Sequence, residues 1–483
     1  MKKISLLLTT AILLTGIYSC KKETEVISPE PITDPVNSTD STAVSSKGSN
    51  AINNWAYNLM KDAYFWSSDM PALNSLNVAE EPSSFFEKLI YNRSTIDRFS
   101  TITANYTSLQ NSFNGVSKIF GIRYTIAYLD ASQASLGLYL SQVVPGSPAE
   151  LAGMKRGQII TAIDGQQITE SNFSSLFTGD THKFTISELV NDAITPTAEL
   201  TATRRVVEEN PVALTKIVNL PNTGKKLGYV LYSQFIPGSE ADAQAYDNQL
   251  RQAFADFKAA GISELVLDLR SNGGGYISSA ETLASLIGKN VNSSKIFYVE
   301  QWNSTYTEYY TKQYGGAYFN HGFRNEPNAL GGALDRVFVL TSNATASASE
   351  LVINGLKPYM EVITIGEHTY GKNLFGTLMQ DNVNNSGYGV YVMLGQTANS
   401  LKQSDYGDVN GIDPTYVVED NVIPYRPYAD ENETLFSKVL EVIGEKNGTV
   451  ARVKPGKKIV RTSNYIYHET EELPLGVMIK DKL

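Results

Sequence analysis

The sequence predicts a multidomain α/β protein, and three patterns along the chain indicate it. Apolar strand-like runs alternate with amphipathic helical runs over residues 210–445, which is typical of βαβ units in a mixed sheet. Short β-type runs dominate residues 111–209, whereas helical spacing of apolar residues dominates residues 51–110. A chain of 483 residues is long enough for two or three such domains.

The first fifty residues precede the predicted folded part. A basic start, Met1-Lys2-Lys3, and the apolar run after it predict a signal peptide over residues 1–19, too short to span a membrane in the mature protein. Cys20, the only cysteine, ends a stretch that resembles a bacterial lipobox. The resemblance implies a lipoprotein anchored through lipid on Cys20 to the cell envelope, on the periplasmic or the outer face of the outer membrane. A secretory signal with an incidental cysteine is the alternative. Residues 20–50, poor in apolar side chains, are predicted to be a disordered tether.

The composition is that of an acidic globular protein. The formal net charge is −10, with 42% hydrophobic and 19% charged residues. This balance argues against nucleic acid as a partner. No cluster of cysteine, histidine and carboxylates has metal-ligand spacing, so we expect no metal and no cofactor.

Two helical runs define the predicted N-terminal domain. They lie at residues 54–60 and 85–91, and Pro71 and Pro82 are expected to break the chain between them. Aromatic side chains in both runs are expected to form the core. This segment is also the candidate interface for a homodimer, a question that the sequence leaves open.

Residues 111–209 carry a distinctive string within their β-type runs. Strands are predicted at residues 119–127, 138–144, 159–163, 183–189 and 197–206. Ahead of the third strand, Pro145-Gly146 predicts a turn and Ser147-Pro148 a helix start, with Gly153 at the helix end. Asp164-Gly165 then predicts a tight hairpin.

The string from Pro145 to Gly165 resembles a PDZ domain of the kind found in bacterial proteases, although Gln158 replaces the usual aspartate. Such domains bind a peptide at a sheet edge and hold its terminal carboxylate with backbone amides. The resemblance implies that Phe120, Gly121 and Ile122 form the peptide-binding loop. An ordinary hairpin glycine at Gly121 is the alternative.

The α/β region begins with a strand, a helix and a second strand. These are predicted at residues 227–235, 243–260 and 265–270, and a run of three glycines, Gly273-Gly274-Gly275, follows. Glycines at the carboxyl end of a strand let backbone amides approach a ligand closely, as in an oxyanion site. A phosphate-type turn or a packing turn is the alternative, but the lysine-bearing phosphate-loop pattern is absent.

A serine and a lysine each follow a later predicted strand. Ser347 follows the strand at 337–340 in a run of small residues, and Lys372 follows the strand at 362–365. This arrangement can bring a hydroxyl and an amine together at one sheet edge, and an amine can serve as the base for a serine nucleophile. The alternative is a small-residue turn and an unrelated surface lysine.

Three motifs together resemble the S41 peptidases, the C-terminal processing or tail-specific proteases. They are Asp268–Gly275, Ala346–Glu350 and Gly366–Lys372, and a fourth, weaker match is Gly411-Ile412-Asp413-Pro414. With the PDZ string, the resemblance covers residues 112–420. It implies an S41 catalytic domain over residues 210–445, a PDZ-like domain over 111–209 and a C-terminal extension over 446–483.

The resemblance also implies roles for single residues. Ser347 is the expected nucleophile and Lys372 the general base, a dyad that requires a neutral, buried amine. The amide of Ala348 and that of Gly274 or Gly275 are the expected oxyanion donors. The family commonly has glutamine four residues after the lysine, where this chain has Gly376. Glu350 and His368 are interpreted as structural.

The expected function is therefore that of a serine endopeptidase cleaving proteins near their C-termini, with the PDZ domain binding substrate tails. Polypeptides with exposed C-termini are the expected partners. The alternative is a catalytically weak or inactive peptide-binding lipoprotein, which Gly376 favours. A Ser/His/Asp hydrolase using one of the four histidines is a third hypothesis, but none of them lies in a recognisable triad motif.

Overall fold

The computed structural model describes residues 48–130, 132–446, 461–468 and 476–480, and these belong to one compact unit. The predicted signal peptide, the tether and Cys20 lie outside the described residues. Among the helices of the described part, none combines the length and the apolar character that a membrane crossing needs.

The N-terminal segment is mostly helical, as the sequence predicts. Pro82 does not break the chain but begins a helix, because a proline at the first helical position loses no hydrogen bond and the Glu81 side chain caps the amides of Ser83 and Ser84. Its elements are α1 (Ser49–Ala63), η1 (Leu73–Ser75), α2 (Pro82–Glu87), β1 (Thr101–Thr103) and α3 (Tyr106–Phe113).

The following segment is β-rich and has its own apolar core. The strand predicted over 119–127 is two strands, because Gly121 has a φ of 94° and interrupts the extended backbone. Ser147 caps the short helix after it, and Asp164 and Gly165, both at positive φ, form the predicted hairpin turn. The elements are β2 (Val116–Ile119), β3 (Ile122–Tyr128), β4 (Leu136–Val143), α4 (Pro148–Leu151), β5 (Ile159–Ile163), β6 (Gln166–Gln167), α5 (Phe173–Leu176), β7 (Thr181–Val190), β8 (Ala193–Thr203) and β9 (Arg205–Glu208).

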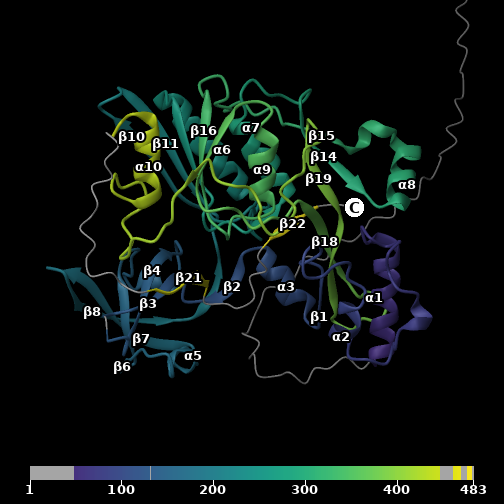
Figure 1. Ribbon diagram of the computed structural model, residues 1–483, viewed down its shortest axis with the longest axis horizontal. Helices are drawn as coiled ribbons and strands as arrows, with labels where there is room; N and C mark the ends of the chain where they lie inside the picture. The colour runs from purple at the N-terminus through teal and green to yellow at the C-terminus, as the bar shows by residue number, and fades with distance from the viewer. Residues whose placement is uncertain (1–47, 131, 447–460, 469–475, 481–483) are drawn as a thin grey trace, which may run out of the picture. The chain divides into compact units, whose positions relative to one another are not determined.

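A mixed sheet forms the centre of the α/β region (Figure 1). The first pair of strands is antiparallel and the rest are parallel. In sheet order they are β10 (Val212–Leu220), β11 (Lys225–Tyr232), β12 (Glu264–Asp268), β16 (Arg336–Thr341), β17 (Glu361–Gly366) and β20 (Tyr416–Val417).

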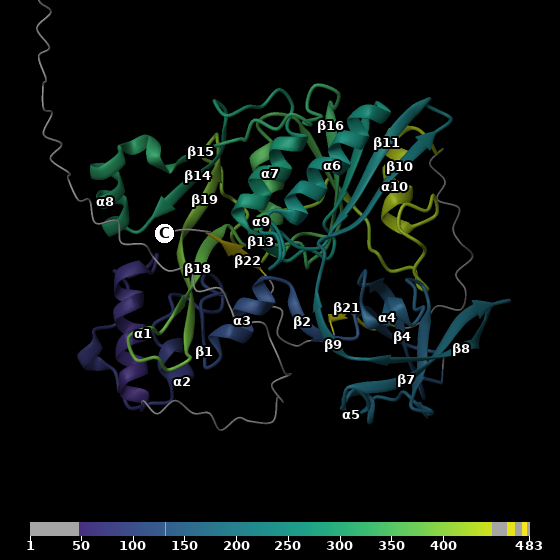
Figure 2. The ribbon, with the colours of Figure 1, turned by 180° about the vertical axis from the view of Figure 1, so that it is seen from behind.

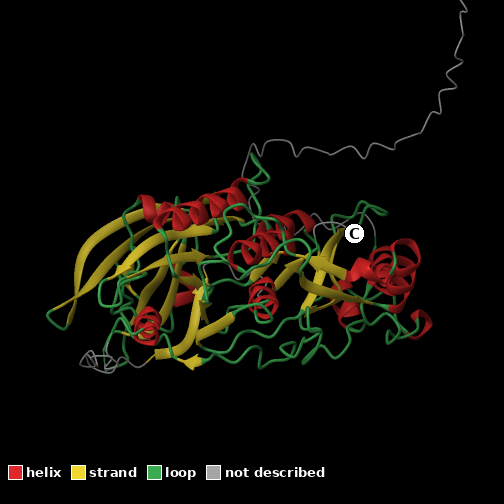
Figure 3. Ribbon diagram, turned by 90° about the horizontal axis from the view of Figure 1, so that it is seen from above, coloured by secondary structure: helices red, strands yellow, loops and turns green. Residues whose placement is uncertain are grey.

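Helices cover both faces of this sheet (Figure 3). Leu265 and Leu267 face one core, which contains apolar residues of α6 (Ala245–Ala260), α7 (Ile277–Ile287) and α9 (Ala348–Leu356). Val266 points to the other core, against α10 (Thr434–Ile443). Successive strand side chains alternate between faces, so a strand that is largely apolar, as predicted, must be covered on both sides.

A second sheet lies beside the first and includes a strand from the C-terminal extension (Figure 2). In order, its strands are β13 (Gly274–Tyr276), β22 (Val477–Ile479), β18 (Leu374–Gln380), β19 (Gly389–Asn399), β14 (Ile296–Trp302) and β15 (Asn320–Gly322), with β1 also paired to β19. The remaining elements are α8 (Ser304–Tyr314), η2 (Gly316–Phe319) and β21 (Arg461–His468), which pairs with β3. The α/β class predicted from the sequence is confirmed, whereas the two strands of the extension were not foreseen.

Candidate active site

The candidate catalytic residues lie where parallel strands end. β16 and β17 are adjacent and parallel. The chain leaves β16 at Thr341 and reaches Ser347 just before α9, and it leaves β17 at Gly366 and reaches Lys372 just before β18. The carboxyl ends of parallel strands share one edge of the sheet, which is where ligands bind in open α/β sheets.

Ser347 has an unusual backbone conformation. Its φ is 64° and its ψ is −110°, a region that residues other than glycine rarely adopt. The side chain is fully buried at the N-terminal end of α9, and its hydroxyl makes no hydrogen bond to any described residue. Backbone strain together with a buried hydroxyl that has no partner is uncommon in a turn that serves packing alone and is typical of functional sites.

Glu350 connects the serine turn to the lysine loop. Its Oε2 accepts hydrogen bonds from the backbone amides of Ser347 at 2.6 Å and Lys372 at 2.9 Å. Its Oε1 accepts from the Gly371 amide at 2.8 Å and from the Thr369 hydroxyl at 2.5 Å. Burial raises the pKa of Glu350 to about 7, against these four hydrogen bonds, which lower it. The sequence analysis interpreted this residue as structural, and its contacts are those of a group that positions both candidate catalytic segments.

The Lys372 amine is held in an almost dry environment. The residue is fully buried, and its Nζ lies 4.5 Å from the centre of the Phe99 ring and 4.9 Å from that of Tyr391. Desolvation lowers the pKa of Lys372 to about 7, although the charges of Asp97 and Glu350 oppose the shift. Nζ donates hydrogen bonds to the Tyr391 hydroxyl, at 3.1 Å, and to a backbone carbonyl of the C-terminal extension.

The N-terminal segment contributes to this environment, which the sequence analysis did not anticipate. Arg98 Nη2 donates to the carbonyls of Tyr370 and Gly371, immediately before the lysine. The Phe99 ring lies under the lysine amine, as described above. No motif marks Arg98 and its neighbours in the sequence, so no local signal could have linked them to the site.

The glycine run packs directly against the serine. A Cβ added to Gly274 would lie 2.9 Å from Cβ of Ser347, so only glycine fits here. The Gly274 amide donates to Asn272 Oδ1 at 2.9 Å, and at Gly275 the added atom would meet the Phe235 carbonyl. Ala348 begins α9, so its amide has no carbonyl partner within its own helix. The structure thus brings Ala348 and Gly274 beside the serine, and their roles as oxyanion donors stay predictions.

Hydrogen bonds hold the glycine loop, residues 269–275, against the turn that carries Ser347. The Asn272 carbonyl accepts from the Ala346 amide at 3.1 Å and from the Ser349 hydroxyl at 3.0 Å. The Thr345 hydroxyl donates to the Leu269 carbonyl at 2.8 Å. These bonds set the distance between the two segments that would bind a reacting carbonyl.

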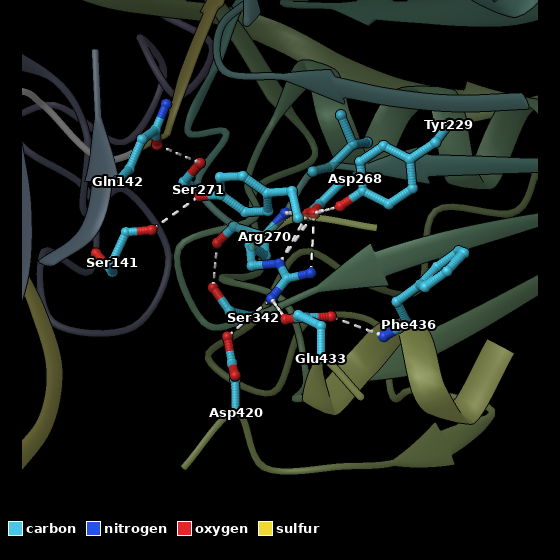
Figure 4. Close-up of polar contacts among 12 residues, drawn as sticks. Ser141, Gln142, Tyr229, Asp268, Arg270, Ser271, Ser342, Asp420, Glu433 and Phe436 are labelled. Atoms are coloured by element: carbon cyan, nitrogen blue, oxygen red, sulfur yellow. Dashed lines mark hydrogen bonds and ion pairs between the residues drawn. The ribbon is translucent and has the colours of Figure 1, made fainter. Parts of the chain in front are cut away.

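A buried charge cluster surrounds Arg270, which shortly precedes the glycine run (Figure 4). Arg270 pairs with Asp268 at 2.9 Å, with Asp420 at 2.9 Å and with Glu433 at 2.5 Å. The Tyr229 hydroxyl donates to Asp268 at 2.5 Å. Arg270 and Asp268 belong to a motif quoted from the sequence, but Asp420 and Glu433 lie 150 and 163 positions away from Arg270, so the sequence could not reveal the whole cluster.

The same region contacts the PDZ-like segment. Ser271 donates to Gln142 Oε1 at 3.3 Å (Figure 4). Arg156 pairs with Glu433 at 3.3 Å. Arg156 also lies over the Tyr428 ring, 4.1 Å from its centre. The glycine loop is therefore in direct contact with the domain expected to bind peptides.

The remaining predicted residues have local roles in the described structure. His368 Nδ1 lies 2.9 Å from the neighbouring Thr369 carbonyl, as a loop residue would. Phe120 is buried against the Phe184 ring, and a Cβ on Gly121 would collide with Ser147. The peptide-binding role of this loop stays a prediction.

Gly376, the position at which the family commonly has glutamine, lies in β18. A Cβ at this position would be 2.4 Å from the Val392 carbonyl, so no larger residue fits. The lysine is instead contacted by the hydroxyl of Tyr391, from the neighbouring strand β19.

The structure thus places a serine and a buried amine near one edge of an α/β sheet, beside a β-rich domain. Residues 226–418 match the model of peptidase family S41, residues 51–101 match that of the peptidase S41 N-terminal domain, and residues 139–182 match a PDZ domain. The chain belongs to the S41 peptidase family and carries a PDZ domain.

Two of the relatives are described as C-terminal processing enzymes. The chloroplastic C-terminal processing peptidase of Tetradesmus obliquus is 29% identical over 296 residues, which cover 58% of this chain and 56% of that protein. The carboxyl-terminal-processing protease of Synechocystis sp. is 27% identical over 304 residues, covering 62% and 63%. The matched part thus spans less than two thirds of either relative. A crystal structure of a Bacteroides fragilis protein assigned to the S41 proteases has a TM-score of 0.70 at 29% identity, covering 81% of this chain and 97% of that one.

Proposed function

We propose that this protein is a serine endopeptidase in which Ser347 is the nucleophile and Lys372 the general base. The observation that supports this most is the shared Glu350 oxygen, which bonds the amides of both residues and holds the two segments side by side. Burial supports the choice of base, because a lysine with a pKa of about 7 is substantially neutral at physiological pH.

The reaction would proceed through an acyl-enzyme. The neutral Lys372 amine removes the proton of the Ser347 hydroxyl as its oxygen attacks the scissile carbonyl, and the resulting ammonium then protonates the departing amine. In the second half of the reaction, Lys372 removes a proton from the water molecule that attacks the acyl carbonyl. The ammonium then returns a proton to the Ser347 oxygen as the acyl group leaves. The Ala348 amide and an amide of the glycine run would stabilise the oxyanion, each donor contributing about 3–4 kcal/mol to the transition state.

The substrates we propose are polypeptides with exposed C-termini, bound through the PDZ domain by addition to its sheet edge near Gly121. Anchoring by lipid on Cys20 would place the enzyme in the cell envelope, facing either the periplasm or the exterior. The same proposal includes a homodimer formed through the N-terminal segment.

Cleavage of a denatured protein by three variants tests the dyad. Ser347→Ala and Lys372→Ala should each abolish cleavage, whereas His368→Ala should keep most of it. If His368→Ala is inactive and Lys372→Ala active, a histidine base replaces the lysine. Lys183→Ala, which removes only an exposed ion pair with Glu199, is the matched control for folding and handling.

The second candidate is a peptide-binding protein without turnover. It is favoured by the missing hydrogen bond between the serine hydroxyl and any described residue. Mass spectrometry of a denatured substrate decides between the endopeptidase and the binding protein. The binding protein would leave the substrate intact at every pH from 6 to 10, and it would still bind a labelled tail peptide.

A further inference from the structure

A strand from the C-terminal extension lies inside the active-site sheet. β22 is inserted between β13, which carries the glycine run, and β18, which follows Lys372 (Figure 2). It runs parallel to both, with Gly274 opposite Val477 and Gly376 opposite Ile479. An extended peptide held between two strands by backbone pairing is the binding mode of β-strand addition.

This strand contacts the groups proposed to carry out catalysis. The Gly476 carbonyl accepts a hydrogen bond from Lys372 Nζ, and the Val477 amide donates to the Gly273 carbonyl at 2.9 Å. The Val477 carbonyl lies against Gly274, 2.2 Å from where a Cβ would be. The lysine is therefore hydrogen-bonded to the chain's own tail, while the Ser347 hydroxyl has no hydrogen bond within the described residues.

A basic side chain anchors the end of the strand. Lys480 forms a salt bridge with Glu300, whose side chain is fully buried, and lies over the ring of Trp302. Trp302 Nε1 donates to the second oxygen of Glu300 at 2.9 Å. The Lys480 amide donates to the Gly376 carbonyl at 3.0 Å. Glu300, which also pairs with His321 at 3.2 Å, and Trp302 thus hold the Lys480 ammonium at the end of β22.

The preceding part of the extension occupies the edge of the PDZ domain. β21 pairs antiparallel with β3, the strand that follows the predicted peptide-binding loop. His468, at the end of β21, is opposite Arg123, near the start of β3 and close to that loop. The β3 edge of the PDZ sheet and the space between β13 and β18 are therefore both occupied by strands of this chain.

We propose that residues 476–480 are a displaceable substrate mimic, which occupies the peptide slot between β13 and β18 and inhibits the enzyme in cis. The slot binds extended segments with three apolar residues followed by a basic residue, and Glu300 selects the basic side chain. The assignment of this slot to substrate rests on the proposed function. Displacement of the tail opens the slot to substrate and removes the Gly476 carbonyl that accepts a hydrogen bond from Lys372 Nζ.

The full-length variant Lys480→Glu tests the inhibition, because it places a carboxylate against Glu300. If the tail occupies the slot in about nine molecules of ten, its release lowers the KM for a peptide substrate about tenfold and leaves kcat unchanged. Lys480→Arg keeps the cation and should behave as wild type. Lys183→Glu, which alters an exposed ion pair in the PDZ domain, is the matched charge-reversal control.

A second measurement does not require turnover. Fluorescence anisotropy follows a labelled peptide with the sequence of residues 476–480 as it binds the Ser347→Ala protein with and without Lys480→Glu. We expect about tenfold tighter binding when the tail carries Lys480→Glu, by the same occupancy argument. A peptide ending in glutamate instead of lysine should bind neither protein.

The outcomes separate this inference from the proposed function. If the peptide binds more tightly as expected but neither the wild type nor any variant cleaves substrate, the proposed slot is supported and the proposed endopeptidase activity is rejected. An unchanged or higher KM for a folded Lys480→Glu protein, or no peptide binding, overturns the slot. If Lys480→Glu unfolds, the milder Lys480→Ala decides: a folded variant with lowered KM supports a displaceable tail, and an unfolded one shows that β22 is a permanent strand and overturns the proposal.

Discussion

Replacing Glu350 with glutamine would test whether this carboxylate positions the catalytic segments. The two side chains have nearly the same shape, but glutamine replaces one acceptor oxygen by an amide group that only donates. If the side-chain NH2 of the glutamine faces Thr369 and Gly371, the Thr369 hydroxyl can accept a hydrogen bond from it. The backbone amide of Gly371 then has no acceptor. In the opposite orientation, the amides of Ser347 and Lys372 both lose their acceptor.

The first orientation leaves fewer donors unpaired and sets the expected size of the effect. One buried amide without a partner costs about 1–3 kcal/mol of unfolding free energy. The charge of Glu350 also raises the pKa of Lys372, so removing the charge should lower that pKa further below about 7. Small displacements of the serine or the lysine should reduce kcat/KM by about a hundredfold.

Urea denaturation and the pH dependence of kcat/KM measure these two effects separately. Glu199→Gln, which removes an exposed salt bridge to Lys183, is the matched control and should change stability by less than about 1 kcal/mol. The reasoning about Glu350 is refuted if Glu350→Gln has the stability of the control and if the midpoint of its pH profile stays in place or moves upward.

Three further predictions follow from the site. Because the pKa of Lys372 is lowered to about 7 and the base must be neutral, kcat/KM should rise as the pH rises through about 7 and level off above it; a profile that falls over this range contradicts a lysine base. Arg270→Ala leaves Glu433 and its neighbours as unpaired buried charges and should cost about 3–5 kcal/mol in urea denaturation, whereas a loss below 1 kcal/mol would mean that water reaches the cluster. Gly274→Ala forces a methyl group into the Val477 carbonyl at a φ of 109°, so the variant should lose activity and melt at a lower temperature; normal kinetics would show that the glycine loop can move away.

Much of the fold could be predicted from local patterns. The strand β5 has the predicted bounds, Gly261 ends α6 in the left-handed conformation, and Asp164-Gly165 makes the hairpin turn. In each case the deciding interactions lie within a few residues of one another. Pro82 was expected to interrupt the chain, but it is the first residue of α2. Proline can either end a helical run or occupy the first turn of a helix. Here the local capping of the helix by Glu81 selects the second possibility.

The site could be predicted in part. Ser347 and Lys372 follow adjacent parallel strands, so a pattern of strands and motifs was enough to propose that they lie close together. Their environment could not be inferred, because the Phe99 ring, the Tyr391 hydroxyl and the Asp420 partner of Arg270 come from distant segments with no motif of their own.

The sequence by itself determined the class of the fold, the family and the two residues proposed for catalysis, because strand and helix periodicity and short motifs are properties of neighbouring positions. Only the tertiary structure decided what surrounds these residues. The burial of the lysine and the insertion of β22 beside it depend on contacts between distant segments, such as Lys372 with Gly476, 104 positions apart. Even the carboxylate that the two amides share lies 22 positions from Lys372. Chain periodicity carries no record of such contacts.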